Sequence, residues 1–460
     1  MITGDTIAAI STPAGEGGIA IVRLSGPCAR AILLELFTPV PDPFIPFHLY
    51  LGLLHDPQSM KAVDQVLAVW MRAGRSYTRE EMVEIHCHGG RLATRKILAL
   101  VLARGARLAE PGEFTRRAFL HGRLDLVQAE AVADLITAHS EQALAVAATQ
   151  LAGGLSAVLA AMKETLSRQL AALEVDLDGL AGEGLQSHKI SLAVELATLL
   201  QRSQALITSY REGRSLVNGL RLVLVGRPNV GKSSLLNALL ERERAIVTDV
   251  PGTTRDVVSE RFELAGIAVE LADTAGICDS ADPLEQLGIA QTDRWLQQAD
   301  LAIMVIDQSQ PLTVADQRLF QRLTSSRHLV VVNKTDLPAA WSESQIRAWL
   351  SHDGPLIPCI AHQRHTNITA LKTALLTLIE QEFSQVAGEQ VVCHLRQKQQ
   401  LEKLAVSLER AMTLLETSQP LLDMVADELH QARGALLELT GERRDSDLLE
   451  TLFANFCVGK

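Results

Sequence analysis

Apolar and polar residues follow different patterns in successive parts of this chain. Runs of β-branched and other apolar residues bounded by glycine, at 17–26 and 80–90, predict strands, and apolar residues spaced as on a helix predict one helix over 91–108. We therefore expect an N-terminal α+β domain over residues 1–120.

A helical pattern follows the first domain. Ala, Leu, Glu and Gln dominate residues 124–210, proline is absent there, and apolar residues recur at intervals of three and four. The same spacing returns at 395–418 and 421–441. These stretches predict one all-α domain made of two parts, 121–214 and 383–460.

Strand-like runs alternate with helix-length stretches between the two helical parts. The runs lie at 221–226, 267–273, 301–307 and 328–333, and this alternation predicts a mostly parallel sheet in an α/β domain. Because helical sequence precedes and follows it, we expect this domain, residues 215–382, to be inserted into the helical one.

Composition restricts the possible partners. The 460 residues carry a formal net charge of -11, and 4% are aromatic, so neither a broad phosphate-binding surface nor a base-stacking platform is indicated. We expect any RNA to be bound mainly through a second protein.

Cysteine usage and the absence of targeting signals indicate the compartment. The six cysteines are scattered without CxxC spacing, which argues against a disulfide framework or a zinc knuckle. The chain has neither a signal-peptide pattern at its start nor a run of about 18 apolar residues. We predict a cytoplasmic protein without a membrane span.

A phosphate-binding loop follows the first strand of the inserted domain. Gly226, Gly231, Lys232 and Ser233 fit GxxxxGK[ST] between a strand and a helix. Backbone N–H groups of such a loop surround phosphate oxygens, and the helix N-terminus adds partial positive charge. Lys232 would reach the outer phosphates, and Ser233 would bind magnesium.

Two further motifs indicate which nucleotide binds. Asn333-Lys334-Thr335-Asp336 follows a strand. The carboxylate of Asp336 would accept both N–H donors of guanine, whereas adenine would leave it unpaired, and Asn333 would contact the opposite side of the base. The DTAG motif, which begins at Asp273, ends another strand and would place a carboxylate near magnesium. GTP is therefore the expected ligand.

GTP hydrolysis requires a residue that orients the attacking water, and the position that usually provides this residue does not provide it here. Ile277 follows DTAG, where Ras-like enzymes have a glutamine that orients water. Thr254 is suited to complete the magnesium shell, and the carbonyls of Thr248, Val250 and Thr253 would surround a cation.

These motifs together have a recognisable pattern. The combination of GRPNVGKSSLLN, TDVPGTTRD, DTAG, NKTD, the PGEFTRRAFLHGRLDLVQAEAVADLI stretch and a terminal FCVGK resembles the MnmE (TrmE) family of tRNA modification GTPases over nearly the whole chain. The family is potassium-activated, and its GTPase domains dimerise across their switch regions. The resemblance implies a multidomain α/β protein: a folate-binding-like α+β domain, a helical domain, and a P-loop GTPase domain inserted in it.

The resemblance assigns ligands in the GTPase domain. It implies that potassium is held by Asn229, Thr248, Val250 and Thr253, magnesium by Ser233 and Thr254, and that Glu285 orients the attacking water. The expected GTP-binding residues are Asn229, Val230, Gly231, Lys232, Ser233, Ser234, Thr248, Asp249, Val250, Pro251, Gly252, Thr253, Thr254, Asp273, Thr274, Ala275, Gly276, Asn333, Lys334, Thr335 and Asp336.

The N-terminal domain matches a folate site. By resemblance, Arg23, Glu84, Arg123 and Lys460 contact 5-formyl- or 5,10-methylene-tetrahydrofolate. Arginines suit the glutamate tail of a folate, and a carboxylate suits the donor edge of its pterin. The alternative is a surface arginine and a solvated strand glutamate.

The C-terminal thiol has two interpretations. In the family the terminal motif folds back toward the folate site, where Cys457 would act as a nucleophile or proton-transfer group; packing of Phe456 and Cys457 is the alternative. Two departures from the family lie in the GTPase domain: Cys278 after DTAG, and 359–364 where a guanine-supporting motif is usual.

The expected function is GTP hydrolysis coupled to tRNA modification. The resemblance implies a homodimer that joins the flavoprotein MnmG in a heterotetramer and forms a 5-carboxymethylaminomethyl or aminomethyl group on the wobble uridine of certain tRNAs. The GTPase motifs alone also fit a GTP-switched assembly or signalling factor without a part in base chemistry.

Overall fold

The computed structural model describes the chain except for residues 1–3, 178–184, 241–258, 265–266, 274–294, 297–298, 324–326, 352–353, 362–366, 384–389, 418–420, 444–445 and 455. Its contacts divide the chain into two compact units. Unit 1 comprises Met1–Ala133, Leu159–Leu170 and His430–Lys460, and unit 2 comprises Asp134–Val158 and Ala171–Leu429.

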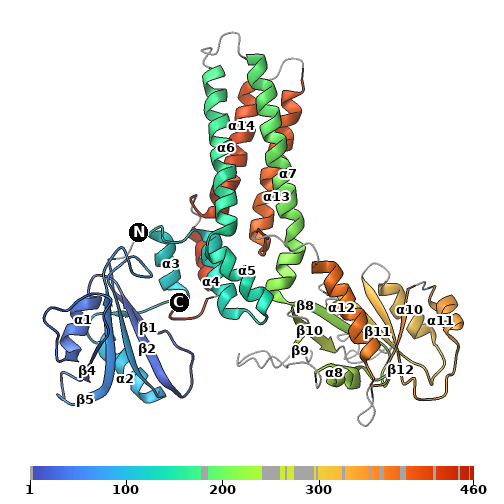
Figure 1. Cartoon of the computed structure of the whole chain (residues 1–460), viewed down its shortest axis with the longest axis horizontal. Coiled ribbons are helices and arrows are strands. Elements are labelled where there is room, and N and C mark those ends of the chain that lie inside the picture. The colour runs from blue at the N-terminus through green and yellow to red at the C-terminus, as the bar shows by residue number, and fades with distance from the viewer. Residues whose placement is uncertain are drawn as a thin grey trace. The chain divides into compact units, whose positions relative to one another are not determined.

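Unit 1 contains a mixed sheet whose strand order is β3-β4-β5-β6-β2-β1-β7. Only β7 pairs in parallel, with β1. Helices α1 and α2 lie on one face, where they bury the inward side chains of β2, β5 and β6 (Figure 1). The elements are β1 (Ile7–Ile10), β2 (Gly17–Ser25), α1 (Ala29–Leu36), β3 (Phe37–Thr38), β4 (Tyr50–His55), β5 (Ala62–Met71), β6 (Met82–Gly89), α2 (Arg91–Leu102), β7 (Arg107–Leu108) and α3 (Glu113–Leu120).

The sequence prediction of one helix over 91–108 is wrong beyond Leu102. Gly105 adopts φ +99°, a left-handed conformation that ends helices. The residues after it turn back, and Arg107–Leu108 pairs with β1.

A buried cation fixes α3 to the rest of unit 1. The guanidinium of Arg117 is 5% exposed and contacts Asp5 at 2.8 Å, Glu80 at 3.1 Å and Glu113 at 3.0 Å. Burial opposes ionisation of Glu113, but hydrogen bonds from Arg107, a backbone N–H and Arg117 outweigh it and hold the pKa of this carboxyl below its usual value. A buried charge that loses one partner is costly, so these contacts hold α3 and the loop before β6 together.

The sheet of the GTPase domain lies in unit 2, with strand order β13-β12-β11-β8-β10-β9. All neighbours are parallel except β9, which pairs antiparallel with β10. Parallel strands joined by helices are the predicted pattern. The elements are β8 (Leu220–Val225), α8 (Lys232–Leu240), β9 (Ser259–Leu264), β10 (Ile267–Asp273), β11 (Leu301–Asp307), α10 (Val314–Leu323), β12 (His328–Asn333), α11 (Glu343–Leu350), β13 (Leu356–Pro358) and α12 (Thr369–Phe383).

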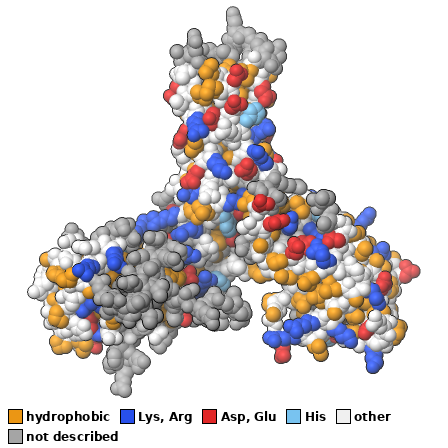
Figure 2. Space-filling model, turned by 180° about the vertical axis from the view of Figure 1, so that it is seen from behind, with side chains coloured by type: hydrophobic (Ala, Val, Ile, Leu, Met, Phe, Trp, Pro, Cys, Tyr) orange, Lys and Arg blue, Asp and Glu red, His pale blue; other side chains and the backbone are white. Residues whose placement is uncertain are grey.

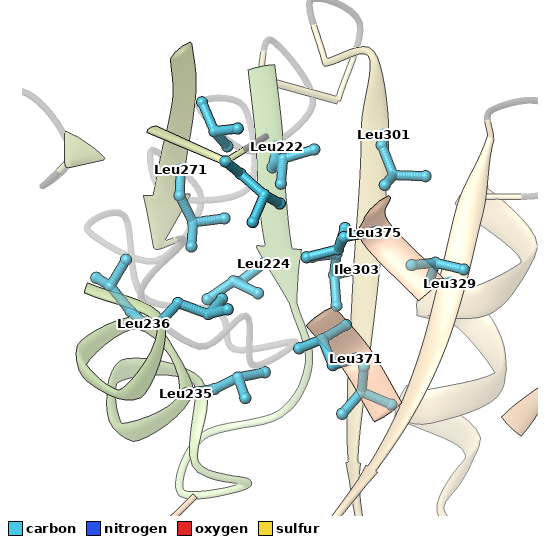
Figure 3. Close-up of a cluster of buried hydrophobic side chains, with 14 of the residues drawn as sticks. Leu222, Leu224, Leu235, Leu236, Leu271, Leu301, Ile303, Leu329, Leu371 and Leu375 are labelled. Atoms are coloured by element: carbon cyan, nitrogen blue, oxygen red, sulfur yellow. The ribbon is translucent and has the colours of Figure 1, made fainter. Parts of the chain in front are cut away.

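Strand β8 is buried on both faces, because its side chains alternate between two cores. Leu222 and Leu224 pack with α8 and α12 in the cluster of Figure 3. Val223 and Val225 pack on the other face with α10 and α11. A strand covered on both sides places its end, and the phosphate loop that follows, at a fixed position.

The other described elements are helices. Within unit 2, α7 and α13 lie side by side (Figure 1). Leu401, Leu404 and Leu408 show the spacing of three and four that buries one side of α13. The helices are α4 (Leu126–Thr137), α5 (Glu141–Leu151), α6 (Gly154–Leu177), α7 (Leu185–Asn218), α13 (Leu395–Leu415), α14 (Leu422–Thr440) and α15 (Ser446–Ala454).

The chain enters and leaves the GTPase domain at neighbouring places. It enters where α7 ends, and on return the side chain of Gln150 donates to the carbonyl of Val391 at 2.7 Å. The N–H of Val392 donates to Ser209 of α7 at 3.1 Å. Gly213 permits this approach, because a Cβ there would lie 2.3 Å from the carbonyl oxygen of Val392. The GTPase domain is thus an insertion in the helical domain.

The surface carries charges of both signs. In the view of Figure 2, acidic and basic side chains intermix along the long helices. Among the described residues no single helix is long and apolar enough to cross a membrane; one bent pair, Glu141–Leu151 with Gly154–Val175, meets that test of length and composition.

Candidate functional site

The phosphate loop bends sharply at two glycines. A Cβ on Gly226 would lie 2.5 Å from the carbonyl oxygen of Val305 in β11, and one on Gly231, which has φ +99°, would lie 2.2 Å from the side-chain nitrogen of Asn333. Both positions therefore require glycine, because neighbouring atoms leave no room for a side chain.

Lys232 begins α8 and turns back into the loop. Its side chain is buried, and Nζ donates to the carbonyls of Gly226 at 3.0 Å and Arg227 at 2.9 Å. These carbonyls hold the ammonium at the concave side of the loop, next to the N-terminus of α8. The next residue, Ser233, is exposed in the first turn. The ammonium of Lys232 and the hydroxyl of Ser233 are therefore suited to bind a phosphate group and the magnesium ion that accompanies it.

Asn333 joins the phosphate loop to a second loop. It is fully buried; its Nδ2 donates to the carbonyl of Val230 at 2.8 Å, and its Oδ1 accepts from the N–H of Ala361 at 3.0 Å. The sequence argument placed this side chain against guanine. That contact stays a prediction, and the two hydrogen bonds show that the amide also holds two loops together.

Lys334 adds a second connection to the phosphate loop. Its Nζ donates to the carbonyl of Asn229 at 2.8 Å and to Asp307 at 2.6 Å. Burial opposes ionisation of Asp307, but hydrogen bonds from Lys334 and Ser309 outweigh it and lower the pKa of this carboxyl. The side chain of Asp307 therefore stays charged and neutralises Lys334.

The base-recognition end of NKTD remains accessible. Asp336 is exposed, so its carboxylate is available to the donors of guanine. Thr335 donates to the carbonyl of Cys359 at 3.1 Å. Burial raises the pKa of the Cys359 thiol to about 12. In the described part of segment 359–364, the backbone thus contacts the motif: the carbonyl of Cys359 accepts from Thr335, and the N–H of Ala361 donates to Asn333.

Many expected GTP-domain residues lie outside the described part of the chain, as do Ile277 and Cys278. Of Asp273 the structure gives only the backbone, which ends β10. The expected site residues without a described position are Thr248, Asp249, Val250, Pro251, Gly252, Thr253, Thr254, Thr274, Ala275, Gly276 and Glu285.

A second group of expected residues meets on the sheet of unit 1, around Arg23 and Glu84. Arg23 on β2 and Glu84 on β6 are cross-strand partners, and their side chains form an ion pair at 2.8 Å. Each of these side chains is 16% exposed. His86 on the same face lies 3.3 Å from Glu84. His88, the other histidine of this strand, instead contacts Asp64 at 2.6 Å.

The C-terminus docks beside this ion pair. The carbonyl of Gly459 accepts from Ser11 at 3.1 Å and from Arg23 at 3.4 Å. Gly459 has φ +95°, and a Cβ there would lie 2.4 Å from the carbonyl oxygen of Ile10. Val458 forms an antiparallel bridge with Pro111. The terminal motif and Arg23 therefore belong to one site.

The last residues differ in exposure. Phe456 is buried against Phe453, with ring centroids 5.3 Å apart, whereas Cys457 is exposed. The thiol contributes little to packing, and it lines a cavity of about 910 Å³ together with Val458 and the loop that follows β1. Lys460 is partly exposed next to Gly459.

Arg123 joins this site through Tyr77. Its guanidinium carbon lies 4.5 Å from the centre of the Tyr77 ring, and its Nη1 donates to the Tyr77 carbonyl at 3.3 Å. The sequence argument did not find Tyr77. A lone tyrosine in a loop gives no signal without the two arginines that fold beside it.

Two family models match the chain. The model described as GTP-binding protein TrmE N-terminus matches residues 6–123, and the MnmE helical domain matches residues 126–457. A tRNA modification GTPase MnmE from Lactiplantibacillus plantarum is 40% identical over 459 residues, which cover 99% of this chain and 98% of that protein. The one from Geobacillus kaustophilus is 41% identical over 464 residues, 99% of each chain.

A substitution at Gly231 tests whether GTP binding depends on the close approach of the phosphate loop to Asn333. Gly231→Ala should weaken GTP binding roughly 100-fold, because the new Cβ strains a left-handed residue and displaces Asn333. Fluorescence titration with a labelled GTP measures the affinity. Gly105→Ala is a matched control, because Gly105 also has φ +99° but no atom within 4 Å of an added Cβ. Wild-type affinity in Gly231→Ala would contradict this geometry.

Proposed function

This chain belongs to the MnmE family of tRNA modification GTPases, and from that premise we propose that it uses GTP turnover to control a one-carbon transfer to tRNA. It is a GTP hydrolase, which implies GTP and magnesium as ligands. The hydrogen bond from Arg23 to the carbonyl of Gly459 is the observation that supports the rest of the proposal. It joins the C-terminal motif to the expected folate site, and a protein that only switches with GTP does not require such a site.

The nucleotide site would work by positioning and charge. Lys232 exchanges its loop carbonyls for the outer phosphate oxygens, and Ser233 is the described residue suited to bind magnesium, with Thr254 completing the shell. Asp336 pairs with the edge of guanine. Phosphoryl transfer needs little covalent chemistry from the protein, so such contacts supply most of the catalysis.

Potassium would complete the phosphate environment when two GTPase domains meet. The exposed side chain of Asn229 supplies one ligand next to the phosphate loop, and Thr248, Val250 and Thr253 supply carbonyls. Bound potassium would contribute positive charge toward the phosphates where other GTPases use an arginine. Glu285 would orient the water that attacks.

The one-carbon chemistry would take place in unit 1. Arg23, Glu84, Arg123 and Lys460 would bind 5-formyl- or 5,10-methylene-tetrahydrofolate, which supplies the one-carbon unit. Paired carboxylate and guanidinium groups on one sheet face fit a ligand that has both donors and carboxylates. Cys457, exposed beside this site, would act as a nucleophile or proton-transfer group.

The assembly would contain two copies of this chain. We infer a cytoplasmic homodimer that joins the flavoprotein MnmG in a heterotetramer and holds tRNA mainly through that partner. The product would be a 5-carboxymethylaminomethyl or aminomethyl group on the wobble uridine. The competing function is a GTP-switched assembly or signalling factor without a direct part in base modification.

Nucleoside mass spectrometry of tRNA tests the choice between these functions. Deletion of the gene should remove the C5-modified wobble uridine, wild-type protein should restore it, and Arg23→Ala should not, although its GTP hydrolysis persists. Arg72→Ala, on an exposed residue directly after β5, is the control that should restore modification. An unchanged nucleoside profile after deletion would favour the assembly factor.

The potassium requirement is tested by ion replacement. GTP hydrolysis should be at least roughly tenfold faster in KCl than in NaCl of equal concentration, because the cation stabilises charge that develops in the transition state. GTP affinity is measured in both salts, so that binding and turnover are separated. Equal rates in the two salts would remove potassium from the mechanism.

A further inference from the structure

Tyr77 links the two arginines of the proposed folate site. The guanidinium carbons of Arg23 and Arg123 lie 5.8 Å and 4.5 Å from the centre of its ring. Both distances fall within the range in which a cation is attracted to an aromatic ring. Tyr77 belongs to none of the sequence motifs that point to GTP or folate.

The position of the Arg123 charge depends on Tyr77. Two contacts hold its guanidinium among the described residues, and both go to Tyr77: the ring, and the carbonyl oxygen at 3.3 Å. No described carboxylate forms an ion pair with Arg123. Arg23, in contrast, is already paired with Glu84 and the carbonyl of Gly459. The positive charge of Arg123 is therefore not neutralised by a described carboxylate, and a carboxylate of the ligand could pair with it.

The Tyr77 ring is itself fixed. Its hydroxyl lies 2.9 Å from the hydroxyl of Thr115, a fully buried residue of α3. The loop that carries the ring is held by a hydrogen bond from Ser76 to the carbonyl of Glu80 at 2.6 Å. Glu80 in turn contacts Arg117, also of α3, at 3.1 Å. The ring therefore offers a preorganised surface for the exposed side chain of Arg123.

We propose that Tyr77 is a positioning residue that holds Arg123 for a carboxylate of the folate glutamate tail. This inference rests on the proposed folate site. An exposed arginine loses side-chain entropy when it binds an anion, and a ring that already orients the guanidinium reduces that cost. The carboxylate of the glutamate tail then binds a guanidinium that is already oriented toward it.

The test is a double-mutant cycle on folate affinity. Calorimetry with 5-formyltetrahydrofolate should show about tenfold weaker binding to Tyr77→Leu, which loses the ring, and to Arg123→Ala. The double variant should bind no more weakly than Arg123→Ala alone, because the ring acts through the arginine. Tyr77→Phe keeps the ring and should stay within about twofold of wild type. Additive losses in the cycle, or full affinity in Tyr77→Leu, would overturn the proposal.

Two further measurements separate the possible failures. Thermal unfolding followed by circular dichroism should be the same in all variants and shows that unit 1, which carries Tyr77 and Arg123, is folded. GTP hydrolysis, which takes place in unit 2, should also be unchanged. If Tyr77→Leu does not fold, Tyr77→Met replaces it: methionine fills the space with a flexible side chain that has no aromatic face, so binding should again be about tenfold weaker, and wild-type affinity there would overturn the proposal. If wild-type protein itself binds no folate, the proposed function fails rather than the role of Tyr77 alone.

Discussion

The nucleotide site depends on one buried amide. Asn333 connects the carbonyl of Val230 in the phosphate loop with the N–H of Ala361 in the loop after β13. Because the amide is fully buried, loss of either partner would leave a polar group unsatisfied. The phosphate loop and the loop after β13 are therefore one hydrogen-bonded unit. Gly231 has to be glycine because this amide occupies the space where a side chain would lie.

The second site follows a similar principle with different chemistry. A carbonyl of the C-terminal motif, a guanidinium from β2 and a carboxylate from β6 meet on one sheet face. Buried ion pairs around Arg117 hold the neighbouring loop and α3 in place. In both sites, side chains whose hydrogen bonds or charges are paired within the protein hold in place the side chains that remain available to bind a ligand. The exposed Asp336 in the first site and the exposed Arg123 in the second are the groups available for binding.

Sequence reasoning succeeded where a motif lies within a short stretch of chain. The strand, loop and helix around Lys232 were predictable because spacing and periodicity are local properties. The fold class, with its inserted GTPase domain, was predictable because helical and strand patterns alternate over long segments. The helix over 91–108 failed at Gly105, where a left-handed residue and pairing with β1 outweigh helical spacing.

Contacts between distant residues could not be predicted. The sequence argument places Asn333 beside guanine, which stays a prediction, but it did not find the hydrogen bonds of this side chain to loops more than 25 residues away in sequence. Tyr77 gave no signal at all, since its proposed role depends on its contacts with Arg23 and Arg123, which lie on other parts of the chain. The switch segments and Glu285 lie outside the described residues, so their roles stay predictions.

Hydrogen exchange of the Ala361 amide tests the central claim most directly. In nucleotide-free protein this N–H should be protected, and Asn333→Ala should raise its exchange rate roughly tenfold or more, because its acceptor is removed. Amides in the central strands β8 and β11 should keep their protection, which shows that the domain remains folded. Unchanged exchange at Ala361 in Asn333→Ala would mean that the loops are not held together by this amide, and would contradict the account.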